Sequence, residues 1–217
     1  MDTKQKILYA ALDLFSQKGY DAVSVRDIAR AVGIKESSLY NHFQNKQDIY
    51  YSIFAFCMTK GEEVGHSLDL TNEENRYVVD EHIRGLYRNI TPQQFAHLTE
   101  TLFDYYFTDE LNVKLRKMLT IEQYRDEEAA KRFRENAFDA ALTYQTELFA
   151  ALIEEGLFRK ADPYMLALAF YSPIFLLFYK FDATPGGHAE ARSQFLRHVD
   201  HFVTTYGIQG TEREEGK

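Results

Sequence analysis

The chain has 217 residues, of which 45% are hydrophobic and 15% aromatic, and it contains four prolines and one cysteine. This length allows one domain or two small ones with a sizeable core, and a single cysteine argues against a disulfide framework. The formal net charge of −8 at pH 7 argues against a broadly basic nucleic-acid-binding protein.

The chain begins with MDTKQKILYAALDLF, a pattern that predicts a capped amphipathic helix. The segment lacks the charged-then-apolar order of a signal peptide, so we expect a cytoplasmic protein. Further along, Cys57 lies in the apolar helical run IFAFCM. A buried small hydrophobe is the simpler interpretation of this cysteine, and a redox switch is the alternative.

The segment from Ser24 to Val32 has the pattern of a short amphipathic helix. Ser24 and Asp27 form a Ser-x-x-Asp start signal, in which the hydroxyl caps free amides and the carboxylate meets the positive end of the helix. Apolar residues recur at i, i+3, i+4 and i+7 from Val25 and form one stripe. Gly33 then allows the left-handed conformation that ends many helices.

A second helix is expected from about Glu36 to Phe43. Leu39 and Phe43 lie four residues apart and face inward, whereas Ser37 and Asn41 point to the opposite side. Small polar side chains on that outer side suit the edges of DNA bases, and longer side chains on its flanks suit phosphates.

Further polar side chains surround this outer side. Ser38 lies beside its centre, Tyr40 and His42 fall on its flanks, and Lys46 begins the next helix, where a cation and free amides can bind phosphate. The segment therefore has the layout of a helix-turn-helix, in which one helix supports and the next enters a DNA groove. A surface helical hairpin with ordinary caps is the alternative, and the pattern alone does not separate the two.

The whole segment from about Lys4 to Phe54 resembles the DNA-binding head of the TetR family of bacterial repressors. The string LYNHFQNK, followed by Asp48 and Ile49, is close to the usual sequence of that family at these positions. The other residues that carry the resemblance are Ile7, Ala11, Phe15, Gly19, Tyr20, Ser24, Val25, Ile28, Ala29 and Gly33.

The resemblance implies an all-α fold, with a three-helix head and a helical body for effector binding and dimerisation. The DNA-binding residues it implies are Tyr40, His42 and Lys46 for phosphates, Ser37, Ser38 and Asn41 for bases, Arg26 for either, and also Ser24 and Lys35.

Two positions depart from the family pattern. The family often has serine at position 35, where it caps the reading helix, and often has threonine at position 38; this chain has Lys35 and Ser38. Lys35 cannot cap in the same way, so a phosphate contact is the alternative role for it.

These patterns divide the chain into a DNA-binding domain over residues 1–61, with its motif at about 24–43, a helical body over 62–208, and a disordered tail over 209–217. Residues 1–50 carry seven Lys or Arg and six Asp or Glu, and the remainder has a net charge of −9. A nearly neutral head on an acidic body fits a protein that contacts few phosphates per head. We also expect strong salt sensitivity and a need for two heads.

Helical patterns in the body cover about 73–90, 92–107, 109–125 and 126–156. Residues 163–179 are apolar on every side, which predicts a buried helix; a membrane span is the alternative, although the run is slightly short and contains Pro173. A second apolar stripe follows over 195–206. Two such helices make half of a four-helix bundle, so we expect a homodimer through about 162–181 and 187–206, with no membrane. A monomeric core pair is the alternative.

Aromatic residues are frequent in the body, where they can line a pocket for a small apolar or aromatic effector. The candidate lining residues are Phe103, Tyr106, Phe107, Tyr124, Phe138, Phe170, Tyr171 and Phe175. Core packing is the simpler role for any one of them. His97, Glu100 and Asp104 share one helix face, as do His198 and His201, and a solvated face is more plausible there than a metal site. We expect no metal and no cofactor.

The function these features predict is a homodimeric repressor that binds a palindromic operator and is released by a small effector. The alternative is a binding module of the same fold that acts through protein or membrane partners. An enzyme has no support, because the sequence contains no nucleophile–base pairing, HExxH motif, glycine-rich phosphate loop or cysteine cluster.

Overall fold

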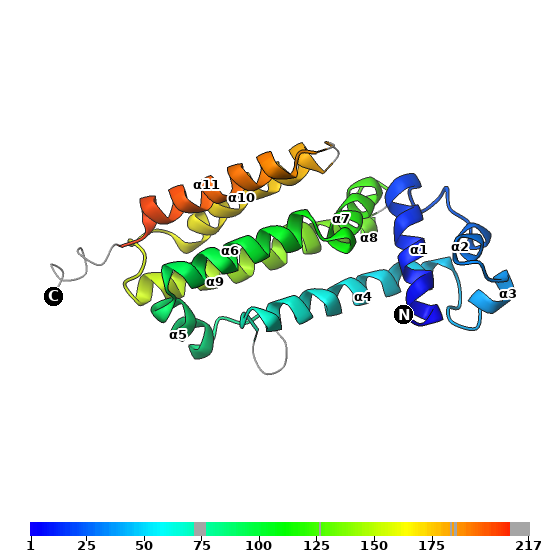
Figure 1. The fold of residues 1–217 in the computed structure, drawn as a ribbon, viewed down its shortest axis with the longest axis horizontal. Helices are drawn as coiled ribbons and strands as arrows, with labels where there is room; N and C mark the ends of the chain where they lie inside the picture. The colour runs from blue at the N-terminus through cyan, green and yellow to red at the C-terminus, as the bar shows by residue number, and fades with distance from the viewer. Residues whose placement is uncertain (72–76, 126, 183, 185, 209–217) are drawn as a thin grey trace. The chain divides into compact units, whose positions relative to one another are not determined.

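The structure, a computed structural model, describes residues 1–71, 77–125, 127–182, 184 and 186–208 (Figure 1). The chain forms two compact units. Unit 1 is Met1–Gly61 with Asp109–Ala137, and unit 2 is Glu62–Thr108 with Phe138–Lys217. The expected tail, 209–217, lies outside the described residues.

Unit 1 consists of α1 (Thr3–Lys18), α2 (Val25–Val32), α3 (Glu36–Leu39), the larger part of α4 (Lys46–Ser67), α7 (Glu110–Glu122) and α8 (Glu127–Arg134). Helix α1 packs against α2 and against α7, which in turn packs against α8. Apolar side chains at most 1% exposed form the core of the head, among them Ile7, Leu12, Phe15, Ile28, Leu39, Ile49 and Ile53.

The helices of the head begin and end where the sequence provides caps. Asp2 accepts a hydrogen bond from the backbone N–H of Gln5 at 2.7 Å and so caps α1. At α2, the Ser24 hydroxyl accepts from the N–H of Asp27 at 3.2 Å, and the Asp27 carboxylate accepts from the N–H of Ser24 at 3.0 Å. Gly33 follows α2 with φ of 76°. The expected helix and its two end signals are therefore confirmed.

The second helix of the motif is shorter than expected. Helix α3 covers Glu36–Leu39, and the chain then continues in turns to Phe43. The expectation of a helix to Phe43 is wrong because Asn45 and Asp48 cap the next helix, with the Asn45 side chain accepting from the N–H of Asp48 at 2.8 Å. The N–H of Phe43 still bonds to the carbonyl of Leu39 at 3.2 Å, so the inward spacing of these two residues is kept.

Unit 2 contains α5 (Glu81–Asn89), α6 (Pro92–Phe107), the π-helical turn η1 (Glu135–Asp139) in part, α9 (Ala140–Glu154), α10 (Pro163–Phe181) and α11 (His188–Tyr206). Figure 1 shows α10 and α11 side by side, and contacts also join α9 to α10 and α6 to α11. The described residues of this unit include two apolar clusters. One includes Phe103, Phe107, Phe178 and Phe195, and the other includes Ile83, Phe149, Leu166 and Phe202.

The division into units differs from the expected domains. The expected body, 62–208, is not one compact unit, because 109–137 clusters with the N-terminal head. The physical reason lies in contacts from α7 and α8 to the head: Lys114 pairs with Asp13 at 2.6 Å, and the Arg132 guanidinium lies 4.4 Å from the ring centre of Tyr51. Within the expected 73–90 helix, the structure begins α5 at Glu81, and residues 72–76 lie outside the described part.

Helix α10 is apolar but only partly covered. Among the described residues it is the one helix long and apolar enough to cross a membrane by length and composition, and 33% of its apolar window is buried. Its exposed apolar side chains include Met165, Leu176 and Tyr179, which are 56%, 64% and 50% exposed. The expectation is burial between the core and a partner, and the side of α10 that this chain leaves uncovered is the side a partner would have to cover.

Candidate DNA-binding and effector sites

The supporting helix α2 presents its cap and two arginines to solvent. Ser24 is exposed, and its hydroxyl donates to the Asp27 carboxylate at 2.6 Å. These bonds from Ser24 lower the pKa of Asp27, with Arg30 adding to the effect. Arg26 is also exposed and lies 3.5 Å from the Glu36 carboxylate at the start of α3. This ion pair links the supporting helix to the expected reading element.

The reading element is amphipathic, as its sequence predicts. Leu39 and Phe43 are 0% and 2% exposed and form its inner side. Its outer side carries polar side chains from α3 and the following turns: Ser37, Tyr40, Asn41 and His42 are exposed, and Ser38 is half-buried. A row of small hydrogen-bonding groups flanked by an aromatic hydroxyl and an imidazole can contact base edges and phosphates together.

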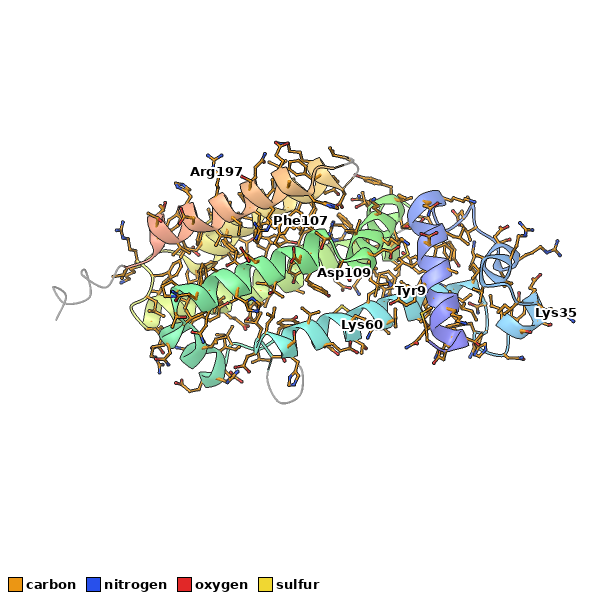
Figure 2. All side chains as sticks on the ribbon, viewed as in Figure 1. Tyr9, Lys35, Lys60, Phe107, Asp109 and Arg197 are labelled. Carbon is orange, nitrogen blue, oxygen red and sulfur yellow. The ribbon has the colours of Figure 1, made fainter. Side chains whose placement is uncertain are left out.

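Lys35 stands at the cap position of α3. Its side chain makes no capping hydrogen bond, so the serine cap of the family is not replaced here by the lysine. Figure 2 shows Lys35 at the end of the head next to α3, with its side chain directed away from the helices. An exposed cation beside the amides that begin a helix suits an anionic partner.

Lys46 is not a freely exposed phosphate-binding lysine, because its ammonium group is already hydrogen-bonded within the protein. Its Nζ donates to the carbonyl oxygens of Tyr20 at 2.8 Å and Val23 at 2.9 Å, and it lies 4.0 Å from the ring centre of Tyr20. An ammonium group has three donors, so one hydrogen is left for a phosphate. The structure thus gives Lys46 an internal bonding role that the sequence does not reveal.

The contacts of Tyr20 include two residues that sequence reasoning missed. Glu122 is the last residue of α7, and Arg125 comes three residues later. Both contact Tyr20, in the link between α1 and α2 in unit 1. Burial raises the pKa of Tyr20, with the nearby Arg125 opposing the shift. No spacing rule connects positions 102 residues apart, so only the three-dimensional structure brings them together.

The aromatic residues expected to line an effector pocket fall into different places. Phe103 and Phe107 are 1% and 2% exposed, and their rings stack on each other at 4.6 Å, so they belong to the core. Figure 2 labels Phe107 on α6. Tyr124 lies in unit 1 and is 87% exposed, which is wrong for a buried pocket wall. The other expected residues are partly exposed residues of unit 2: Tyr106, Phe138, Phe170, Tyr171 and Phe175.

A group of tyrosines in unit 2 is a better candidate. The rings of Tyr77 and Tyr144 lie 5.9 Å apart, and burial raises the pKa of both well above its ordinary value. Tyr87 and Tyr106 contribute to the raised pKa of Tyr144, and burial raises the pKa of each of them to about 12. These phenols are therefore protonated hydrogen-bond donors at neutral pH.

In α9, two buried side-chain oxygen atoms have no hydrogen-bond partner among the described residues: the hydroxyl of Tyr144 and Oε1 of Gln145. Buried polar groups are almost always hydrogen-bonded, and exceptions mark strain, water or a missing ligand. The candidate residues predicted from the sequence include Tyr106 of this group but not Tyr77 or Gln145.

The titratable residues weighed as metal ligands are solvent-facing or bonded within the protein. His97, Glu100 and Asp104 are exposed on α6, and Glu100 pairs with Arg192 at 2.6 Å. Nε2 of His198 lies 2.7 Å from the carbonyl oxygen of Phe170. In the described part of the chain no group of three or more His, Cys, Asp or Glu has the arrangement of a metal site. Cys57 is buried, and burial raises its pKa to about 12, so the thiol is protonated at neutral pH.

Comparison with known proteins agrees with the geometry of the head. The model of the bacterial regulatory proteins of the tetR family matches residues 7–53. The chain is 36% identical over 119 residues to the Staphylococcus epidermidis biofilm operon icaADBC HTH-type negative transcriptional regulator IcaR, a match that covers 54% of this chain and 53% of IcaR. The chain thus spans about half the length of this curated relative.

Solved structures with a similar fold cover nearly all of the chain. A TetR-family transcriptional regulator from Mesorhizobium loti gives a TM-score of 0.64 at 21% identity, covering 94% of this chain and 96% of that one. SmeT, the repressor of the Stenotrophomonas maltophilia multidrug efflux pump SmeDEF, gives a TM-score of 0.66 at 19% identity in its complex with triclosan, covering 96% and 93%. The head is therefore similar in sequence to the tetR family of bacterial regulatory proteins, and the fold of the chain is similar to that of solved members of this family.

Proposed function

We propose that this protein is a homodimeric, sequence-specific DNA-binding regulator of transcription, a repressor that a small apolar or aromatic effector releases from its operator. The observation that carries the proposal is the exposed polar side of the reading element over the buried pair Leu39 and Phe43. IcaR, about half of whose length this chain matches, is named as a negative transcriptional regulator, and SmeT as a repressor.

Dimerisation is supported by the uncovered side of α10. Met165, Leu176 and Tyr179 recur with helical spacing and are each at least half exposed. A contiguous exposed apolar surface is unusual on a monomer and marks a partner surface. A second copy that supplies the same α10 and α11 would complete a four-helix bundle, because a two-fold axis pairs the same surface of both subunits.

Effector binding is supported by the tyrosine group of unit 2. Tyr77, Tyr87, Tyr106 and Tyr144 offer four phenol donors on aromatic rings, which suits a mostly apolar molecule with one or two hydrogen-bonding groups. SmeT has been solved in complex with triclosan, an effector-sized molecule, which makes a small-molecule effector a reasonable proposal for this chain. Such an effector acts only if it binds the DNA-free and DNA-bound conformations with different affinity.

A mobility-shift experiment with DNA from upstream of the protein's own gene tests the proposal. We expect a specific shift that survives excess unrelated DNA and weakens steeply as salt increases. The same proposal includes a cytoplasmic location without membrane binding. The chain should therefore stay in the supernatant after centrifugation with phospholipid vesicles.

The second candidate is a binding module of the same fold that acts at a membrane or through protein partners. The exposed apolar side of α10 is the observation that favours it. Absence of any specific DNA shift, together with pelleting of the chain with vesicles, would contradict the first proposal and support this one.

A further inference from the structure

Glu122 is a buried carboxylate in an unfavourable place. It is 4% exposed and stands at the last position of α7, where the helix presents its partly negative end. A buried charge is costly unless it is paired and hydrogen-bonded, and an anion at a helix C-terminus adds to that cost. Sites where a sequence departs from such local rules are often functional, so the partners of Glu122 matter.

The two oxygens of Glu122 have separate partners, both in unit 1. Oε1 accepts the backbone N–H of Tyr20 at 2.7 Å, and Oε2 accepts from Nη1 of Arg125 at 2.7 Å. The chain approaches closely here because of Gly19: a Cβ at that position would lie 3.3 Å from Oε1 of Glu122. Gly19 also has φ of 80°, a backbone conformation that residues other than glycine rarely adopt.

Tyr20 connects Glu122 to the DNA-binding elements. Its carbonyl oxygen accepts from Nζ of Lys46, the first residue of α4, and its ring has Lys46 at 4.0 Å and Arg125 at 4.5 Å from its centre. Two cations against one ring repel each other, and the Glu122 carboxylate beside Arg125 offsets that repulsion. Val23, the second acceptor for Lys46, directly precedes the cap residue of α2.

We infer that Glu122 is a positioning residue for operator binding: from α7 it fixes the main chain of Tyr20, and through Tyr20 it sets the position of Lys46 at the start of α4. The inference rests on the proposed function, because it concerns affinity for an operator. It deepens that proposal by making α7 part of the DNA-binding machinery without a DNA contact of its own.

A matched control exists on the same pair of helices. Asp13 of α1 and Lys114 of α7 form an ion pair at 2.6 Å, but neither residue contacts Tyr20 or Lys46 through any interaction described above. Asp13→Asn removes this pair with little change of volume, as Glu122→Gln does at its own site. If any weakening between α1 and α7 lowers DNA affinity, the two variants will behave alike.

The experiment measures the affinity of the full-length protein for DNA that the wild type selects from random sequence. We expect Glu122→Gln to weaken operator binding about tenfold, equivalent to about 1.4 kcal/mol, with Asp13→Asn unchanged. Combined with Lys46→Met, the loss from Glu122→Gln should shrink, because the two residues act through one position. A purely structural role would leave the two losses additive.

Three results would overturn the inference: unchanged affinity in Glu122→Gln, an equal loss in Asp13→Asn, or additive losses with Lys46→Met. If Glu122→Gln does not fold, Arg125→Gln is measured by the same criteria, since it removes the charge that Glu122 pairs with. A wild type that selects no DNA sequence at all would contradict the proposed function instead, so the two failures are distinguishable.

Discussion

The ammonium group of Lys46 is bonded to the main-chain carbonyl of Tyr20 at 2.8 Å, although 26 residues separate them in sequence. This contact ties the start of α4 to the link between α1 and α2. Lys46, to which the family resemblance assigns a phosphate contact, therefore also connects two parts of the head.

Replacing Lys46 should reduce both stability and DNA affinity. We expect Lys46→Met, which keeps the apolar stem, to lower the free energy of unfolding by about 1–3 kcal/mol, because two carbonyls lose a charged donor. Operator affinity should fall as well. Urea unfolding and a mobility shift measure the two effects. Tyr40→Phe is the control, since Tyr40 is half exposed and its loss should lower DNA affinity alone. Equal stability of Lys46→Met and wild type would contradict this prediction.

The cap of α2 should make stability depend on pH. The hydroxyl and N–H of Ser24 lower the pKa of Asp27 below its ordinary 3.8, so the ionised carboxylate stabilises the folded state. A lowered folded pKa gives stability that is present above the unfolded value and is lost as the pH falls through the folded one. Wild type should therefore be more stable than Asp27→Asn at pH 7, and the difference should shrink as the pH falls below 3.8 and through the lowered pKa of Asp27.

Urea unfolding at several pH values checks this difference, and Ser24→Ala is the matched variant because it removes the hydroxyl and keeps the carboxylate. A wild type no more stable than Asp27→Asn at neutral pH would show that the cap has no such effect.

Substitutions on the reading element should change sequence preference. Ser38→Ala and Asn41→Ala remove side chains expected to face bases, and each lost base contact reduces discrimination by about 1–3 kcal/mol. Lys35→Ala should instead weaken binding to all sequences and reduce its salt dependence. Binding profiles over a library of operator variants separate the two kinds of effect. An unchanged profile for Ser38→Ala and Asn41→Ala would remove these residues from the base-reading surface.

A charge on the exposed side of α10 should separate the subunits. Leu176 is 64% exposed in the single chain, and the proposed dimer would bury it. Because an unpaired buried charge is costly, we expect Leu176→Glu to be largely monomeric by sedimentation and to bind the palindromic operator weakly. Met58 is 53% exposed on α4, so Met58→Glu is a control that should remain dimeric. A dimeric Leu176→Glu would place the subunit contact elsewhere.

The tyrosine group and the phenylalanine core of unit 2 should respond differently to mutation. Tyr144→Phe keeps the ring and removes a buried hydroxyl without a described partner, so it should cost little stability but weaken binding of a small apolar phenol used as a probe several-fold. Phe103→Ala should instead lower the free energy of unfolding by about 3–5 kcal/mol, since the ring is buried. Calorimetry with the probe and urea unfolding measure the two effects. Unchanged probe affinity in Tyr144→Phe would exclude this hydroxyl from the site.

Local features of the fold could be predicted from the sequence, and long-range ones could not. The cap formed by Ser24 and Asp27, the end of α2 at Gly33 and the inward pair Leu39 and Phe43 follow from spacings of a few residues, and the structure agrees with them. The length of α3 was mispredicted, because helical spacing persists through the turns that follow Leu39.

The grouping of 109–137 with the head depends on contacts across more than 100 residues, such as that of Glu122 with Tyr20. Aromatic content likewise predicts that a core or a pocket exists, but not that Phe103 belongs to the core and that Tyr124 is exposed. These assignments depend on how the helices pack, which the period of one helix does not determine.

The central claim is that two copies of the head read a symmetric DNA site, and selection of bound DNA from a random-sequence pool by the full-length protein tests it most directly. We predict enrichment of a palindrome whose half-sites lie about 34–36 Å apart, one turn of the double helix, or a multiple of this distance. Recovery of no common sequence, or of a single unpaired half-site, would contradict the account.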